Sequence, residues 1–264
     1  MAPAAAHNDN WKLAVLIDAD NVPRNCIKGV MEEVAIYGVP TIKRIYGDWT
    51  NPNIGGWKTA LLENAITPIQ QYGYTTGKNS TDSAMIIDAM DILYTNSVDG
   101  FVIVSSDSDF TRLAIRLREA GKKVIGIGER KTPGPFIAAC NKFIYIEVIR
   151  AGKTDKPSKE EIQEQMAEQK ARHVKQRHNN IPEKIVDLIA DSISDLSTDD
   201  EGVFMGELGN LLIKKQPDFD HRNFGFKSLS AMIKSIDRFE VEFRQTADPN
   251  IKHPYVKDRE AQEN

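Results

Sequence analysis

The stretch KLAVLIDADNVP, residues 12–23, joins an apolar run to a polar turn. Residues 13–17 have the length and the continuous apolar character of a buried strand. Two carboxylates and an amide follow this run at once, in Asp18, Asp20 and Asn21. These polar residues either form an Asx turn ahead of a helix or hold a ligand at the end of the strand, and the stretch alone leaves both interpretations open.

Apolar runs of strand length alternate with helix-length segments over the first half of the chain. The strand candidates are residues 13–17, 41–46, 68–72, 101–105, 123–127 and 143–148. The helix candidates lie near 23–36, 56–65, 80–94, 109–120 and 133–140. This alternation predicts βαβ units, and the continuous apolar runs predict strands that are covered on both faces. We therefore expect an α/β fold with a three-layer parallel sheet.

The character of the chain changes after residue 149. Residues 150–180 carry almost no large apolar side chains and place acidic residues before basic ones, as a solvated helix does. Three helical patterns and two short strands follow, at 182–193, 205–215, 226–236, 239–243 and around 255–256. This order indicates a small winged-helix domain of the α+β class. We expect a first domain at 11–149, a charged helical linker at 150–180 and a second domain at 181–258.

The composition is that of an ordinary globular protein. The 264 residues carry a formal net charge of −4, which argues against a generally basic nucleic-acid-binding surface but leaves room for a local basic groove. Cys26 and Cys140 lie far apart and outside any metal-binding pattern, which favours a reducing, cytoplasmic environment. The first residues lack the features of a signal peptide, and no apolar run is long enough to span a bilayer. We expect a cytoplasmic protein with no membrane partner.

Two more acidic clusters follow the one that ends the first strand. KNSTDSAMIIDAMDIL, residues 78–93, is the first of them, and FVIVSSDSDF, residues 101–110, is the second. At 100° per residue, Asp82 points along the apolar stripe of its helix, whereas Asp88 and Asp91 point to the opposite side. We expect Asp88 and Asp91 to face solvent. A lone carboxylate on an apolar stripe is costly unless something compensates it, although Asp82 could also favour the start of its helix.

The topology of a parallel sheet brings these clusters together. Asp18, Asp82, Asp107 and Asp109 all lie at the carboxyl ends of strands or at the start of a helix, and so at the edge where α/β folds bind ligands. Four carboxylates would repel one another there, and a divalent cation would offset the repulsion. Oxygen ligands favour Mg²⁺ or Mn²⁺. Each cluster taken alone could equally be a turn or a helix cap, and Asp48, which also follows a strand, is better explained by a turn.

A carboxylate-held Mg²⁺ or Mn²⁺ orients water and stabilises the charge of an in-line phosphoryl displacement. No P-loop, HExxH motif or Cys/His nucleophile pair competes with the acidic clusters. Near the predicted site, Lys78, Arg130 and Lys131 are candidates for phosphate contacts, with ordinary solvated charge as the alternative.

The three acidic motifs, AVLIDADNV, KNSTDSAMIIDAMDIL and FVIVSSDSDFTRLAIRLREAGKKVIGIG, closely resemble in this order the NYN domain, a branch of the PIN-like nucleases. The resemblance spans 11–149 and implies a PIN-like Rossmannoid sheet and a metal-dependent ribonuclease. It implies that Asp18, Asp82 and Asp107 hold the metal, that Asn21 supports Asp18, and that Asp109 belongs to the catalytic group. Asp20 stands at a variable position of the family. Ser106 replaces the glycine of many relatives and is kept as a candidate substrate contact.

The segment from 198 to 258 resembles a LOTUS, or OST-HTH, domain. Its marks are GELG at 206–209, PDFD at 217–220 and FGFKSLSAMI at 224–233. The resemblance implies binding of RNA or docking to a partner protein. The apolar residues of the last motif are expected to form winged-helix core: Phe224, Phe226, Leu229, Met232 and Ile233. Arg222 and Lys227 are candidate phosphate contacts.

Two other functions compete with a ribonuclease. DADNV also resembles the opening motif of haloacid-dehalogenase-like phosphatases, in which Asp18 would be the nucleophile and Asp20 the general acid. Alternatively, the protein binds RNA or a partner without catalysis. Asp20 separates the two enzymes, because it should be essential in a phosphatase and more dispensable in a nuclease. The sequence leaves open the RNA substrate, the mode of cleavage, the oligomeric state and the placement of the two domains.

Overall fold

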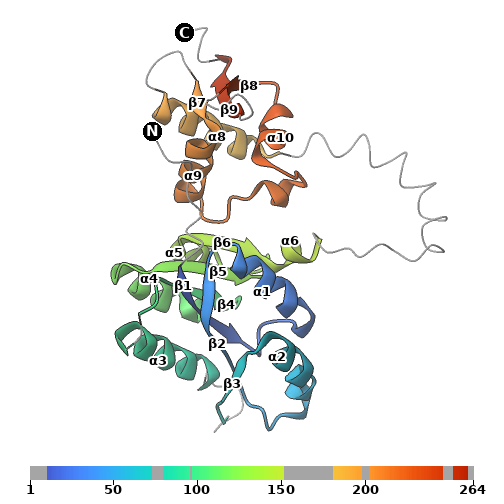
Figure 1. Cartoon of the computed structure of the whole chain (residues 1–264), viewed down its shortest axis with the longest axis vertical. Helices are drawn as coiled ribbons and strands as arrows, with labels where there is room; N and C mark the ends of the chain where they lie inside the picture. The colour runs from blue at the N-terminus through green and yellow to red at the C-terminus, as the bar shows by residue number, and fades with distance from the viewer. Residues whose placement is uncertain are drawn as a thin grey trace, which may run out of the picture. The chain divides into compact units, whose positions relative to one another are not determined.

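The computed structural model describes residues 11–72, 80–95, 97–151, 181–197, 202–245 and 252–260. These residues form two compact units, one on each side of residue 153 (Figure 1). Residues 152–180, which are most of the predicted linker, lie outside the described residues.

A six-stranded parallel sheet forms the centre of the first unit (Figure 1). Its strands are β1 (Lys12–Asp18), β2 (Val39–Gly47), β3 (Thr67–Gln70), β4 (Gly100–Val104), β5 (Lys123–Gly128) and β6 (Lys142–Tyr145). They lie in the order β3-β2-β1-β4-β5-β6, and all neighbours are parallel. β1 is hydrogen-bonded to both β2 and β4, so Asp18 ends a central strand.

Helices cover both faces of this sheet, as the alternating pattern predicted. They are η1 (Arg24–Cys26), α1 (Ile27–Ala35), η2 (Pro52–Trp57), α2 (Lys58–Asn64), α3 (Ser80–Thr95), η3 (Ser108–Phe110), α4 (Thr111–Glu119), α5 (Gly134–Ala139) and α6 (Ile146–Ala151). Side chains of α1, α2 and α6 belong to one buried apolar cluster, and those of α3, α4 and α5 belong to the other. The fold is the expected α/β type with a PIN-like parallel sheet.

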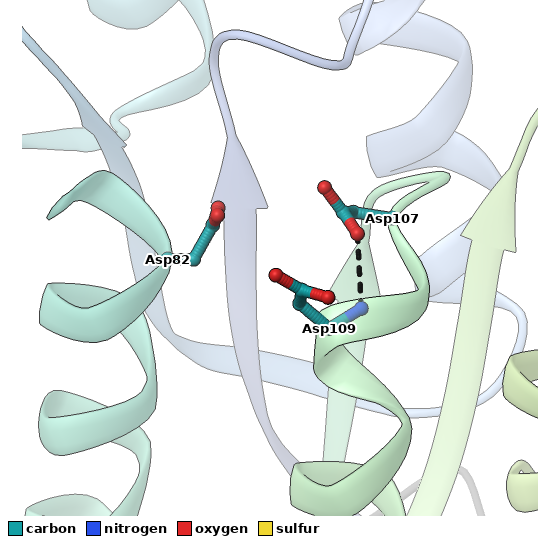
Figure 2. Close-up of side chains that lie close together, drawn as sticks. All are labelled: Asp82, Asp107 and Asp109. Atoms are coloured by element: carbon teal, nitrogen blue, oxygen red, sulfur yellow. Dashed lines mark hydrogen bonds between the residues drawn. The ribbon is translucent and has the colours of Figure 1, made fainter. Parts of the chain in front are cut away.

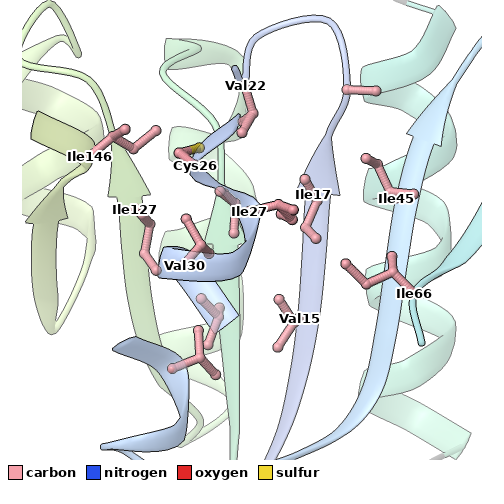
Figure 3. Packing of buried hydrophobic residues seen from close by; sticks show 14 of the residues in the cluster. Val15, Ile17, Val22, Cys26, Ile27, Val30, Ile45, Ile66, Ile127 and Ile146 are labelled. Carbon is pink, nitrogen blue, oxygen red and sulfur yellow. The ribbon is translucent and has the colours of Figure 1, made fainter. Parts of the chain in front are cut away.

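The apolar run of β1 is continuous because both faces of the strand are buried. Val15 and Ile17 point to the α1 side, where Figure 3 shows them packed near Val30 and Ile27, whereas Leu16 points to the α3 side. All three β1 side chains are fully buried. Because each such side chain contributes about 1.5–3 kcal/mol when buried, the strand fixes the sheet firmly beneath Asp18.

The prediction of a strand over 143–148 was partly wrong. β6 ends at Tyr145, and α6 begins at Ile146. Ile146 and Ile149 both belong to the cluster on the α1 side, and a spacing of three places two residues on one helix face rather than on one strand face. A short apolar run fits both periods, which is why the pattern did not reveal the change.

The second unit contains three helices and a three-stranded antiparallel sheet (Figure 1). Its elements are α8 (Glu183–Leu196), β7 (Val203–Phe204), α9 (Met205–Lys215), η4 (His221–Phe224), α10 (Leu229–Lys234), β8 (Phe239–Gln245) and β9 (Lys252–Asp258). β9 is the central strand, in the order β7-β9-β8. The three helices and the hairpin match the predicted winged-helix order, and β7, with two residues, is too short to show in the sequence.

The predicted core of the second unit is confirmed. Met232 and Ile233 are fully buried, and Phe224, Phe226 and Leu229 pack against the same cluster while partly exposed. Among the helices that the structure describes in either unit, none combines the length and the apolar character needed to cross a bilayer.

Candidate metal centre

Three carboxylates meet at the carboxyl edge of the sheet. One oxygen from each of Asp82, Asp107 and Asp109 can be chosen so that all three atoms lie within 4.8 Å of one another. Figure 2 shows the side chains pointing into the same space, with Asp82 on α3 and the other two on the segment that follows β4. The edge is the one at which the sequence predicted these acidic clusters to converge.

The turn after β4 positions two of these carboxylates. Asp107 is the N-cap of η3, and its Oδ1 accepts a hydrogen bond from the backbone N–H of Asp109 at 2.9 Å (Figure 2). The cap holds the chain so that both side chains point toward α3. Asp107 is partly buried, whereas Asp109 is exposed at the rim. The capping interpretation of SSDSDF is therefore correct, and it is compatible with a ligand site because capping and convergence occur together.

Asp82 completes the group from the first turn of α3. Only 9% of its surface is exposed, and it lies on the face of α3 that buries Met85 and Ala89 against the sheet. Burial is the largest cause that raises its pKa from 3.8 to about 6, and the nearby charges of Asp18, Asp107, Asp109 and Asp20 contribute in the same direction. The fold therefore places the Asp82 carboxylate where its ionised form is unfavourable, and a bound cation would compensate for this cost.

Asp18 is a buried hydrogen-bond acceptor beside this group. Its exposed fraction is 1%, and burial raises its pKa. Its Oδ1 accepts from the Asp20 backbone N–H at 3.0 Å, and its Oδ2 accepts from Asn21 Nδ2 at 2.7 Å and from Ser105 Oγ at 2.8 Å. The expected support from Asn21 is present as a contact. Asp18 does not belong to the three carboxylates that lie mutually within 4.8 Å.

Ser105 is a site residue that the sequence reasoning did not single out. It is fully buried, donates to Asp18 and accepts the backbone N–H of Asp107 at 3.1 Å. Its hydroxyl thus links the first acidic cluster to the third. The available signal was the pair of serines before Asp107, of which only Ser106 was considered.

Family comparison follows the same division of the chain. The NYN domain model matches residues 12–147, which is more than half of the chain, and the OST-HTH/LOTUS domain model matches residues 179–251. The chain belongs to the NYN family. NYN domains are PIN-like nucleases, which typically use divalent metal ions, and OST-HTH/LOTUS domains are RNA-binding modules. Both resemblances noted in the sequence are confirmed.

Two solved structures are similar to parts of the chain. A protein of unknown function from Vibrio parahaemolyticus is 21% identical over 55% of this chain and 96% of its own, with a TM-score of 0.46. An uncharacterized protein from Nitrosomonas europaea is 36% identical over 28% of this chain and 70% of its own, with a TM-score of 0.25. No curated protein matches the chain.

The donor set of the NYN domain fits a hard divalent cation. Asp82, Asp107 and Asp109 offer carboxylate oxygens, and no histidine or cysteine is among them. Oxygen donors favour Mg²⁺ or Mn²⁺ over Zn²⁺. The raised pKa of Asp82 agrees with a cation site. Burial and the neighbouring charges oppose the ionised form of Asp82, and a bound cation would favour it.

The prediction that Asp88 faces solvent was wrong. Asp88 is partly buried and forms an ion pair with Arg44 and a hydrogen bond with Tyr46, both on β2. It lies 120° from Asp82 around α3 on the ideal helix, which is the side that meets β2 rather than solvent. Asp91 is exposed, as predicted.

The candidate phosphate contacts of the NYN domain are mostly engaged within the protein. Ser106 Oγ accepts the backbone N–H of Glu129 at 2.8 Å, and Lys131 Nζ lies 2.6 Å from Glu129 Oε2. The guanidinium carbon of Arg130 lies 5.4 Å from the centre of the Tyr145 ring. Lys78 lies outside the described residues. Their contact with substrate stays a prediction.

Three candidate residues remain to be described, one in the first unit and two in the second. Asp48 Oδ1 accepts from the backbone N–H and the hydroxyl of Thr50, so it organises a turn, as expected. In the second unit, Arg222 is paired with Asp220 at 2.7 Å, and Lys227 is exposed.

Proposed function

We propose that the protein is a Mg²⁺- or Mn²⁺-dependent ribonuclease. Its NYN domain would hydrolyse phosphodiester bonds of RNA that the OST-HTH domain helps to bind. The observation that carries the proposal is the convergence of Asp82, Asp107 and Asp109 at the ligand-binding edge of the sheet. The family match supplies the reaction class, because NYN domains are PIN-like nucleases.

The residues divide into those that bind and those that position. Asp82, Asp107 and Asp109 would hold the metal, which when bound stabilises the charge of the phosphoryl displacement. Asp109 is exposed at the rim, so its carboxylate also has room to accept a hydrogen bond from the attacking water and orient it. Asp18 would act either as a further metal ligand or indirectly, through Ser105, which accepts a hydrogen bond from the Asp107 backbone N–H.

Variants of the acidic group test the proposal on the full chain. Single-stranded RNA is incubated with Mg²⁺, Mn²⁺ or a chelator, and cleavage is followed for wild type, Asp82→Asn and Asp107→Asn. Both variants should lose about a hundredfold or more of the metal-dependent rate, as enzymes do when an electrostatic stabiliser is removed. Asp91→Asn is the matched control, because Asp91 is an exposed aspartate of the same helix as Asp82.

The outcome also separates the alternatives. Cleavage that survives both variants, or wild-type RNA binding with no metal-dependent cleavage of any RNA, would overturn the proposal and favour a binding protein. A phosphatase would need Asp18 as an accessible nucleophile, yet Asp18 is 1% exposed and accepts three hydrogen bonds. Asp20→Asn should therefore retain most of the RNA cleavage of wild type. Its rate of phosphomonoester hydrolysis should be no lower than that of wild type.

A further inference from the structure

The sheet of the OST-HTH domain has one face on the core and one face away from it. Val256 of the central strand is fully buried, and its partner in β8, Val241, packs against the same apolar cluster. Successive side chains of a strand point to opposite faces. Those next to Val256, Tyr255 and Lys257, therefore lie on the side away from the core.

The cross-strand register gives the membership of this second side, which we call the outer face. Tyr255 pairs with Phe204 of β7 and with Glu242 of β8, and His253 pairs with Arg244. Residues paired directly across a sheet share a face. Lys257 pairs with Glu240 of β8. The outer face therefore consists of seven residues: Phe204, Glu240, Glu242, Arg244, His253, Tyr255 and Lys257.

Three aromatic rings of the outer face form a cluster. The ring centre of Phe204 lies 5.3 Å from that of His253, at an interplanar angle of 85°, and 5.8 Å from that of Tyr255, at 50°. All three residues remain partly exposed. The ring of Phe204 packs closely against Gly206, where an added Cβ would lie only 2.7 Å from the nearest ring carbon. The sheet thus presents a fixed group of rings outside its core.

An arginine packs against one of these rings. The guanidinium carbon of Arg244 lies 4.3 Å from the centre of the Tyr255 ring. Glu242 lies 3.6 Å from Arg244 and 3.9 Å from Lys257, so one carboxylate is shared between two cations. With Glu240, two carboxylates balance the two cations, so the outer face is neutral, although the domain as a whole carries more acidic than basic residues.

We propose that the outer face binds unpaired bases of single-stranded RNA. Bases would stack on the exposed ring surfaces and on the guanidinium plane of Arg244, while Arg244 and Lys257 contact the phosphates. Aromatic rings bordered by cations fit nucleic acid strands, in which a π-face and a negative charge recur at every nucleotide. The acidic balance of the domain makes a grip through phosphates alone weak, so stacking carries the binding. The proposal concerns where RNA binds and holds whether or not the NYN domain cleaves it.

Binding to the full chain in the presence of chelator tests this site without any cleavage. The probe is a 10-nucleotide fluorescently labelled single-stranded RNA, and its anisotropy is measured against wild type, Tyr255→Leu and Phe243→Leu. We expect Tyr255→Leu to bind about tenfold more weakly, as the loss of one base–aromatic stack predicts. Phe243 is an exposed aromatic residue of β8 that pairs with Pro254 on the opposite side of the sheet, so Phe243→Leu should bind as wild type does.

A second variant and a second measurement protect the test against misfolding. Arg244→Gln should weaken binding and reduce the slope of log affinity against log salt by about 0.7, the value for one phosphate contact on a single strand. RNA that carries 5-iodouridine should, after irradiation, crosslink to residues of β7 or β9. Equal affinity of Tyr255→Leu and wild type, or crosslinks confined to the NYN domain or to α10, would overturn the proposal. The proposal would also be overturned if these variants lost affinity for a protein and kept their affinity for RNA.

Discussion

Asp82 is the residue at which folding and function oppose each other most directly. It is 9% exposed, and the charges of four other aspartates act on it, two at or just after the end of β1 and two in the turn after β4. Its pKa of about 6 means that the folded state holds this proton over a range of pH in which the unfolded state has released it. In the metal-free protein Asp82 therefore reduces stability above that range.

The pH dependence of stability follows from this shift. As pH rises from about 4 to 6, the unfolded state binds fewer protons than the folded state, so the Asp82 contribution to the free energy of unfolding falls. Asp82→Asn removes this contribution. With chelator present, the variant should be more stable than wild type by about 1–3 kcal/mol at pH 8, and equally stable below pH 4. Urea denaturation at both pH values measures the difference, and a variant less stable than wild type at pH 8 would contradict the assignment.

Single residues also mark the limit of what the sequence could reveal about the site. The convergence of Asp82, Asp107 and Asp109 followed from the topology of a parallel sheet. The hydrogen bond between Ser105 and Asp18 did not, because it joins residues 87 positions apart through side-chain directions that periodicity does not specify. For the same reason the sequence predicted Asp18 as a ligand without revealing that its oxygens already accept three hydrogen bonds.

At the scale of elements, α3 is fixed to the sheet by more than its apolar stripe. Asp88 is joined to Arg44 and to the hydroxyl of Tyr46, and Tyr46 is fully buried. Burial and the bond to Asp88 both raise the pKa of Tyr46, so the phenol stays protonated and donates. Tyr46 pairs with Asp18 in the sheet, which places this network one strand from the acidic group.

Removing the carboxylate of Asp88 should loosen α3. Asp88→Ala leaves the buried Tyr46 hydroxyl without this acceptor, which is expected to lower the free energy of unfolding by about 1–3 kcal/mol. Asp91→Ala changes an exposed position of the same helix and should stay within about 0.5 kcal/mol. Urea denaturation followed by tryptophan emission compares the two, and equal effects would show that the network adds nothing to stability.

The elements themselves were largely predictable, and the exceptions have a common cause. Strands such as 101–105 were evident because both of their faces are buried, which leaves a continuous apolar run. The run at 143–148 was too short for strand and helix periods to differ, and it contains the end of β6 and the start of α6. Asp88 was misplaced because a helical angle gives a direction but not the neighbouring element in that direction.

At the scale of the whole molecule, the two units differ in the chemistry of their candidate sites. The NYN unit presents three converging carboxylates, whereas the OST-HTH unit presents aromatic rings beside an arginine. The three tryptophans, Trp11, Trp49 and Trp57, all belong to the NYN unit. Tryptophan emission of the full chain therefore reports the unfolding of the NYN unit without a contribution from the other.

Metal should stabilise one unit and leave the other unchanged. A ligand that binds the folded state at a hundred times its dissociation constant adds about 2.7 kcal/mol to the free energy of unfolding. Saturating Mg²⁺ should therefore raise the midpoint of the tryptophan-detected thermal transition of wild type at pH 8. Asp107→Asn should lose most of this increase, whereas Tyr255→Leu should retain it. Calorimetry of the full chain completes the test, because the heat absorbed by the OST-HTH unit should appear at the same temperature with Mg²⁺ and with chelator. A metal-dependent shift of both units, or of neither, would contradict a cation site confined to the three carboxylates of the NYN domain.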